Sequence, residues 1–341
     1  MRNLTRNNHF VAQAYRRRWS PNRTHVCSYR VLVSSVRVPE WELRGIRGLA
    51  CKSDLYTTSM GGDDIDDFEK WIGKEYEAPG LEAMDALLNR GRLSAIGWRS
   101  LARFVAAQDI RTPLSYFESM RRWKDTVPTI LNECLKGSAA LSKRQLKRIA
   151  TSRAQPSNPF AESIQVDVSR DSCDAGHAAI RASVLLGRRL WLQSIRNILR
   201  VATDALSRHR WSIGEPHGDE EWCTTDQPVV RLNYYGAGNY DFGGGWANKG
   251  TEIMMPLDPR HLLYVQVGRR SGASIAFTRS QTELLQRILV ERAHRWVFGR
   301  TPTTWVREAK PRVVDRAVFA DEQRGWKEWH RNHAEAERTA I

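Results

Sequence analysis

The chain has 341 residues, of which 41% are hydrophobic and 27% charged, as in a globular protein with a large core. Its 53 Lys and Arg residues against 38 Asp and Glu give a net charge of +15. No apolar run approaches the length of a membrane span, which argues against a membrane protein. The net charge favours a polyanionic partner, and nucleic acid is the most obvious one.

The positive charge is almost all arginine, with 43 Arg against 10 Lys. Guanidinium forks suit phosphate and carboxylate recognition, whereas a GC-rich genome would raise the Arg content with no functional meaning. The ratio leaves both explanations open, but genome composition does not explain the net charge. The candidate nucleic-acid surface consists of basic residues in two segments: Arg16, Arg17, Arg18, Lys143, Arg144, Lys147 and Arg148.

The cysteines are odd in number and widely spaced: Cys27, Cys51, Cys134, Cys173 and Cys223. They include no C-x-x-C pair, so neither a zinc knuckle nor a redox motif is present. We expect reduced thiols in a cytoplasmic protein. No cofactor can be assigned from the sequence.

Residues 1–155 are predicted to form a basic arm, a β-hairpin and a helical lobe. The segments 26–38 and 41–51 carry β-branched and aromatic residues in rough alternation, which predicts two strands with a break at Pro39. Asp63 or Asp64 is expected to cap a helix with an acidic first turn. Further helices are predicted at 80–89, 94–108, with Ser94 as the cap, and 113–136.

Residues 156–322 are predicted to form a second lobe, separated from the first by the linker-like segment 154–159. It opens with the longest predicted helix, 176–208, and continues with short strands, a glycine-rich loop at 236–250, a helix at 279–294 and then the apolar run Trp296-Val297-Phe298. The strands are expected at 210–213, 221–224, 229–233, 252–255, 262–267 and 274–277. The polar, charged tail, 323–341, is expected to be helical and poorly anchored.

This order predicts an α+β fold: a helix-rich first lobe with a short N-terminal β-hairpin, a long central helix, then a mostly antiparallel sheet with a C-terminal helix. We expect the two lobes to form one integrated domain.

Four segments together resemble a large bacterial family, domain of unknown function 4238. The first is Asn8 to Ser20, similar to the family's opening signature His-(Phe/Tyr)-Val-Pro-Gln-x-Tyr-Leu-Arg-x-Phe-Ser. The others are residues 93–113, ending in Gln108-Asp109-Ile110-Arg111-Thr112-Pro113, then 222–229, containing Thr224-Thr225-Asp226-Gln227-Pro228, and 253–259. The resemblance covers about residues 7 to 300 and implies no particular reaction.

The chain departs from the family pattern at four positions. Ala12 replaces the usual proline, Arg16 the usual leucine, Gln227 the asparagine and Asp258 the serine. Arg16 therefore puts a charge where the family usually has an apolar anchor. Any site built on these elements is expected to differ here.

His9 is the first catalytic candidate, because an imidazole can act as general acid or base near neutral pH. Gln13 lies four residues on and would share a helical face with it, and Tyr15 completes the group as a second binding candidate. The alternative is that His9 is a structural residue whose hydrogen bonds hold the N-terminal arm.

Three further candidates come from the later motifs. Gln108 and Arg111 end a predicted helix before Pro113, and Arg111 could hold a phosphate with two hydrogen bonds or cap its own helix. Asp226 lies in a polar turn, where it could orient His9, bind a metal, or hold the corner as an Asx-turn. The sequence does not tell whether these residues meet in space.

Two hypotheses about function follow. The first is a nuclease-like enzyme acting on nucleic acid, such as a toxin or an effector in phage defence, with His9 as acid or base, Arg111 on the phosphate and Asp226 as orienting residue. The second is a non-catalytic nucleic-acid-binding protein in which the motifs fix the fold. A small-molecule enzyme with a basic surface of no functional meaning is a third.

Overall fold

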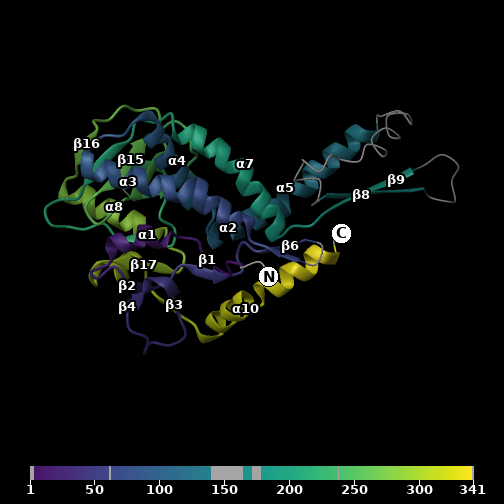
Figure 1. Ribbon diagram of the computed structural model, residues 1–341, viewed down its shortest axis with the longest axis horizontal. Helices are drawn as coiled ribbons and strands as arrows, with labels where there is room; N and C mark the ends of the chain where they lie inside the picture. The colour runs from purple at the N-terminus through teal and green to yellow at the C-terminus, as the bar shows by residue number, and fades with distance from the viewer. Residues whose placement is uncertain (1–3, 61–62, 140–163, 171–177, 237, 340–341) are drawn as a thin grey trace.

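The computed structural model describes residues 4–60, 63–139, 164–170, 178–236 and 238–339. The fold is α+β, as predicted, with mostly antiparallel sheets, an N-terminal β-hairpin and a C-terminal helix (Figure 1). Within these ranges, no helix combines the length and the apolar character that a membrane crossing needs.

A six-stranded sheet forms the centre of the C-terminal half, in the order β13–β12–β14–β15–β10–β16. All its neighbours are antiparallel except β10 and β16. Side chains alternate along β14, because successive residues of a strand point to opposite faces: Ile253 and Met255 join the largest core, whereas Met254 packs in the core beneath α8. The strands are β10 (Ser212–Glu215), β12 (Val230–Gly236), β13 (Asn239–Asp241), β14 (Glu252–Pro256), β15 (Leu262–Gln266) and β16 (Ser274–Ala276), and α8 spans Arg279–Glu291.

A four-stranded sheet joins the two ends of the chain, in the order β11–β17–β2–β4. The predicted hairpin is confirmed as the antiparallel pair of β2 and β4, with Tyr29 opposite Trp41. The next strand, β17, comes from the C-terminal half of the chain. The strands are β2 (His25–Arg30), β4 (Trp41–Gly45), β11 (Thr224–Thr225) and β17 (Trp296–Gly299).

Three helices pack against one another beside the six-stranded sheet: α3 (Ala78–Arg90), α4 (Ala95–Ile110) and α7 (Arg188–Leu206). A fourth, α5 (Pro113–Ala139), contacts α7 and runs away from this sheet toward β9 (Ala178–Val184) (Figure 1). Ser94 caps α4 as predicted, because its Oγ accepts the backbone N–H of Gly97 at 3.1 Å. The largest core contains residues from Phe10 to Trp329 and so draws on both predicted lobes. The predicted lobe boundary at 154–159 lies outside the described residues.

The predicted helix 176–208 is wrong in its first part. Residues 178–184 form strand β9 (Ala178–Val184), which pairs with β8 (Ile164–Arg170), and the helix begins only at Arg188. The β-branched residues Ile180 and Val184 fit a strand, and the extended backbone of Gly187 separates the two elements. The β8–β9 hairpin projects from one end of the molecule (Figure 1).

The helix start predicted at Asp63 or Asp64 is also wrong. Both residues belong to β7 (Asp63–Ile65), paired with β6 (Thr58–Met60), and the helix α2 (Asp67–Ile72) begins later. Asp64 accepts hydrogen bonds from Ser59 and from Arg6, so its partners lie across strands rather than in a helix turn. A π-helical turn, η3 (Gly73–Glu77), then leads into α3.

The C-terminal tail is helical, as predicted, but its poor anchoring is not observed. Helix α10 (Arg316–Thr339) runs beside β6 along one edge of the molecule (Figure 1). Trp329 and Glu337 of this helix are buried. The tail is anchored because these side chains reach the core, which its polar average composition hides. Other short elements are β1 (Asn7–His9), α1 (Gln13–Arg16), η1 (Arg17–Trp19), β3 (Leu32–Val33), η2 (Ile46–Gly48), β5 (Cys51–Ser53), α9 (Trp305–Ala309) and β18 (Val313–Val314).

Candidate functional site

Tyr15 joins the first motif to the third and fourth. Its fully buried hydroxyl donates to the carbonyl of Pro256 at 2.7 Å and lies 2.7 Å from Oγ1 of Thr224. Nearby, Nε1 of Trp19 donates to the carbonyl of Trp222 at 2.7 Å. These contacts explain why distant segments share one place in the fold, and they give Tyr15 a structural role rather than a surface for a ligand.

The second motif meets the same place from the end of α4. Oε1 of Gln108 accepts the backbone N–H of Ala12 at 3.4 Å, and Oγ1 of Thr112 donates to Oε1 of Gln227 at 2.8 Å. Arg111 is fully buried, donates to the carbonyl of Phe10 at 3.2 Å and pairs with Glu77. The four motifs therefore converge.

Asp226 holds the corner before β17. Its two carboxylate oxygens accept the backbone N–H groups of His294 at 2.8 Å and Arg295 at 2.7 Å, and its own N–H donates to the carbonyl of Trp296 at 3.0 Å. Burial raises the pKa of Asp226 to about 6, although the two backbone donors oppose that rise. Its oxygens are thus engaged by the backbone.

His9 lies on β1 beside this convergence. Its Nε2 is 3.0 Å from the carbonyl of Arg47, and its Nδ1 is 3.3 Å from Nε2 of Gln13. A carbonyl can only accept, so Nε2 carries the proton and Nδ1 accepts from Gln13. Burial lowers the pKa of His9. Hydrogen bonds of His9 within the described ranges do not include one to Asp226.

A cleft of about 240 Å³, called the motif cleft below, opens where the motifs meet. Phe10, Pro113 and Asp226 from the first three motifs line it. The rest of the wall comes from β2, β4, β5, the start of β17 and α10: Arg30, Arg44, Gly48, Ala50, Cys51, Lys52, His294, Arg295, Trp296, Glu322, Gln323 and Trp326.

Cations outnumber carboxylates in the motif cleft. Four basic side chains line it against two carboxylates, and one of the latter, Glu322, accepts from Nε of Arg295 at 2.6 Å. The ammonium of Lys52 lies 4.4 Å from the ring centroid of Trp326. Burial lowers the pKa of Lys52 to about 8 and that of His294 to about 3. At neutral pH the cleft thus holds cations and a neutral imidazole.

Behind the wall of the cleft lies a group of buried donors. Within the part of the chain that the structure describes, each of four side chains has at least one N–H group without a hydrogen-bond partner. All four are at least 96% buried and come from the motifs: Arg16, Gln108, Arg111 and Gln227. A buried polar group costs stability unless it is paired, so this place is polar for a reason other than packing.

Arg16 was expected on a nucleic-acid surface, and that expectation is wrong. Its side chain is fully buried, donates to the carbonyl of Ile46 at 3.0 Å, and its pKa is lowered by burial to about 9. The side chain faces inward because it follows Tyr15 on the turn that buries the first motif. Arg17 is exposed, and Arg18 pairs with Asp85 at 2.5 Å. Lys143, Arg144, Lys147 and Arg148 lie outside the described residues.

The sequence analysis missed Lys52, His294 and Arg295. Each lies beside a short strand, without a recognisable motif around it. The signal that could have drawn attention to them is the adjacency of cations and aromatics in His294-Arg295-Trp296. Across the described ranges, no group of three or more His, Cys, Asp or Glu side chains could hold a metal ion.

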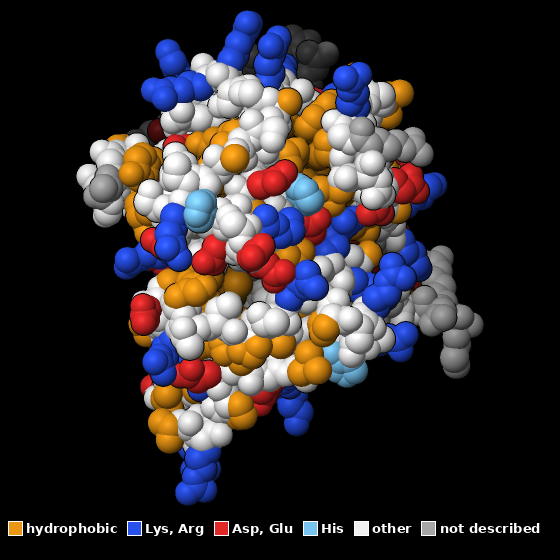
Figure 2. Space-filling view, turned by 90° about the vertical axis from the view of Figure 1, so that its left-hand side faces the viewer, with side chains coloured by type: hydrophobic (Ala, Val, Ile, Leu, Met, Phe, Trp, Pro, Cys, Tyr) orange, Lys and Arg blue, Asp and Glu red, His pale blue; other side chains and the backbone are white. Residues whose placement is uncertain are grey.

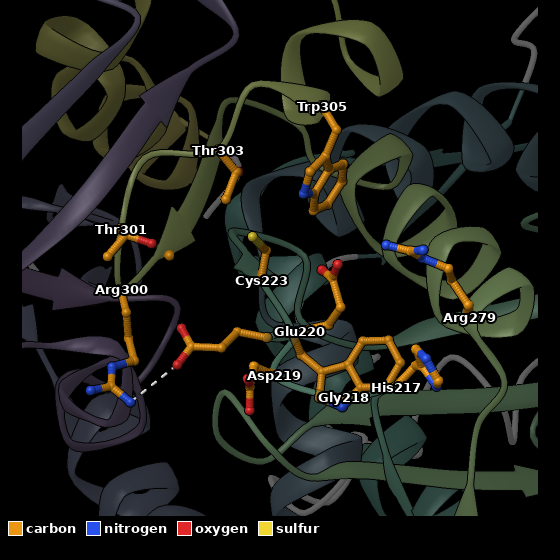
Figure 3. A pocket seen from close by; sticks show the side chains of 13 residues that line it. His217, Gly218, Asp219, Glu220, Cys223, Arg279, Arg300, Thr301, Thr303 and Trp305 are labelled. Atoms are coloured by element: carbon orange, nitrogen blue, oxygen red, sulfur yellow. Dashed lines mark hydrogen bonds and ion pairs between the residues drawn. The ribbon is translucent and has the colours of Figure 1, made fainter.

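A second hollow, the Glu220 pocket, is larger, at about 500 Å³ (Figure 3). It is lined by residues 217–223, Arg279 of α8 and residues of the segment 299–305. Its lining holds three carboxylates against two arginines, and one of these arginines, Arg300, pairs with Glu221 at 3.1 Å. The thiol of Cys223 points into the same space, and burial raises its pKa to about 12, which keeps it protonated.

The exterior does not show one continuous basic field on the face drawn in Figure 2. Lys and Arg side chains stand there among Asp, Glu and hydrophobic side chains. On this face positive side chains are therefore interspersed with negative ones.

The fold and the cleft define an α+β protein with a basic cleft built by four convergent motifs. The chain belongs to the family described as Protein of unknown function (DUF4238), which matches residues 7–303, as the resemblance predicted. No curated protein and no solved structure matches the chain. Helix α10, which forms one wall of the cleft, lies beyond the matched range.

Proposed function

We propose that this protein acts on nucleic acid and that the motif cleft holds one phosphate of the backbone. The observation that carries the proposal is the cluster of four cations in a small cleft to which three of the motifs contribute a lining residue each. Arg forks and a Lys ammonium are the side chains that bind phosphate oxygens most strongly. The net charge of +15 would attract the polyanion over longer distances.

Lys52 is the side chain best placed to meet the phosphate. Within the described residues it makes no ion pair with a carboxylate, whereas Arg295 is engaged by Glu322. Lys52 is partly buried, and a cation there gains more from an anionic partner than an exposed one because solvent screens it less. An incoming phosphate would satisfy the ammonium without displacing an existing ion pair.

Hydrolysis of the phosphodiester is a second candidate, favoured by the titrating groups in the same cleft. Lys52, with a pKa of about 8, can exchange a proton near neutral pH, and His294, whose pKa burial lowers to about 3, offers a neutral imidazole beside it; strongly shifted pKa values gather at catalytic sites. His9 also stays a catalytic candidate, although its ring nitrogens bond to Arg47 and Gln13. We therefore propose Lys52 and His294, ahead of His9, as the catalytic candidates.

The binding test is fluorescence anisotropy with labelled RNA and DNA over a range of salt concentrations. The proposal expects affinity that falls steeply with salt, and a Lys52→Gln variant that binds about ten-fold more weakly, with a salt slope smaller by about one. The control removes one charge at an exposed arginine that does not line the cleft: Arg92→Gln should change affinity by less than about two-fold. Salt-independent binding, or none, would contradict the proposal.

The hydrolysis test incubates the wild type with RNA and with DNA, with and without Mg²⁺. Product formation that is lost in Lys52→Gln or His294→Gln while binding persists would support catalysis in the cleft. Loss only in His9→Ala, with an intact fold, would return the catalytic role to the first motif. Absence of product with all substrates would leave the binding function alone.

A further inference from the structure

We infer that the motif cleft accepts single-stranded rather than duplex nucleic acid, and that Trp326 of α10 is a stacking platform for an unpaired base. The inference rests on the proposed function, since it names the form of the ligand whose phosphate the cleft would hold. It is carried by separate observations: the aromatic rings among the cations and the fixed position of α10.

Aromatic rings and cations alternate around the cleft. Arg30 lies 5.0 Å from the ring centroid of Trp296, and Arg44 lies 5.3 Å from the same ring. The ammonium of Lys52, on β5, lies 4.4 Å from the ring centroid of Trp326, on α10. Sites for single strands combine a positive groove with aromatic faces on which bases stack. In a duplex the bases are stacked on each other and cannot reach such rings.

Trp296 and Trp326 are both partly accessible, although each also packs against the core. Both indoles line the cleft itself rather than its outside. The Lys52 ammonium and the Trp326 ring are thus close enough for the phosphate and the base of the same nucleotide to reach them. A base on Trp326 would place its own phosphate beside Lys52, so a single nucleotide can engage both.

The cleft cannot widen easily, because α10 is fixed at both ends. At its start, β18 pairs with β3, and Oδ1 of Asp315 accepts the N–H groups of Ala317 and Val318, both at 2.9 Å. Toward its end, the buried Glu337 pairs with Arg188 at 2.8 Å. A wall fixed in this way keeps the space near about 240 Å³, which is at the small end of ligand sites.

Glu322 adds a second restriction. Its carboxylate holds the guanidinium of Arg295 and adds a negative charge to the lining of the cleft, which opposes the entry of additional phosphates. A single nucleotide has one phosphate to place, whereas a duplex brings a second strand of phosphates toward the same wall. The carboxylate therefore favours a flexible strand that can direct one phosphate to Lys52 and the next away.

The experiment compares a labelled single strand of about ten nucleotides with a duplex of the same length, as RNA and as DNA, by anisotropy at fixed salt. The wild type should bind the single strand at least about ten-fold more tightly. Trp326→Ala should weaken single-strand binding about five-fold or more and leave duplex binding unchanged, whereas Trp326→Phe should keep most of the affinity. Trp305→Ala, in the Glu220 pocket, is the matched control and should change neither.

The ring centroids of Trp326 and Trp329 lie 5.2 Å apart, so a change at Trp326 also affects the packing of α10. Thermal unfolding of each variant therefore checks that the fold is intact. Equal or tighter binding of the duplex would overturn the inference and leave the proposed function intact. An equal loss for both ligands in Trp326→Ala, with Trp326→Phe equally weak, would also overturn it. Binding of neither form by the wild type would instead overturn the proposed function.

Discussion

The motif cleft and the Glu220 pocket differ in the balance of positive and negative side chains that line them. The Glu220 pocket is about twice as large, yet its Arg300 and Glu221 neutralise each other and its thiol is held protonated. The motif cleft is small, but four cations meet two carboxylates there, and two of these cations, Arg30 and Lys52, have no carboxylate partner within the described ranges. Unmatched charge in a confined space, rather than volume, is what marks a place for an anionic ligand.

The largest expected effect concerns the polar layer behind the motif cleft. Arg111→Met removes a fully buried guanidinium and leaves Glu77 and the carbonyl of Phe10 without their donor. We expect a loss of about 3 kcal/mol of unfolding free energy in urea, because breaking a buried pair from one side leaves a group unpaired. Glu77 is partly exposed, which places the loss at the lower end of the range. A loss below about 1 kcal/mol would show that this layer does not support the fold.

Asp226→Asn is expected to cost about 2 kcal/mol. An amide can accept from only one of the two backbone N–H groups, those of His294 and Arg295, and turns its own N–H toward the other. Chemical denaturation of the variant at neutral pH measures the loss. An unchanged stability with lost activity would instead assign Asp226 to chemistry.

The pH dependence of stability separates His294 from Asp226. The folded-state pKa of His294 is lowered to about 3 from 6.5, so the stability it contributes is full above pH 6.5 and falls by about 1.4 kcal/mol for each pH unit below it. The raised pKa of Asp226 acts in the opposite direction, since its stability contribution is largest below about pH 4 and is lost as pH rises through 6.

His294→Asn should therefore lower the slope of unfolding free energy against pH by about 1.4 kcal/mol per pH unit between pH 4 and 6.5, measured by denaturant titrations at successive pH values. The exposed His25, changed to Asn, is the control and should leave the slope as it is in the wild type. An unchanged slope in His294→Asn would show that burial does not keep this imidazole neutral.

The smallest effect is expected in the Glu220 pocket. Arg300→Gln breaks an ion pair whose arginine is half exposed, so it should change stability by less than about 0.5 kcal/mol. A loss above about 1 kcal/mol would mean that the Arg300–Glu221 pair supports the fold as strongly as a buried ion pair does, which its exposure argues against.

Local patterns predicted the secondary structure where the residues decide it alone. The cap of α4 was predicted because the Ser94 hydroxyl accepts a backbone N–H within its own first turn. The hairpin of β2 and β4 was predicted because β-branched and aromatic residues alternate in two neighbouring segments. The helix starts at Asp63 and at residue 176 were wrong, because each of these segments pairs as a strand with the strand directly before it in the sequence, β7 with β6 and β9 with β8. Partners of a strand cannot be read from its own sequence.

The site was predicted in part. Family motifs indicated Gln108, Arg111 and Asp226, and the structure brings them together, but their bonds are mostly to backbone and to one another. Lys52 and Arg295 are made cleft residues by tertiary contacts with α10 and β17, which no spacing in the sequence encodes. The basic run Arg16-Arg17-Arg18 predicted that Arg16 is a surface cation, yet its side chain is buried.

The central claim is tested most directly by neutralising the two sets of cations in pairs. Arg44→Gln with Lys52→Gln removes two charges from the motif cleft, and Arg279→Gln with Arg300→Gln removes two from the Glu220 pocket. Binding of a labelled single strand, measured over a range of salt, should weaken by about ten-fold or more with the first pair, with a salt slope smaller by about two, and by less than about two-fold with the second. Equal losses from both pairs would contradict the claim, since the affinity would then depend on net charge alone.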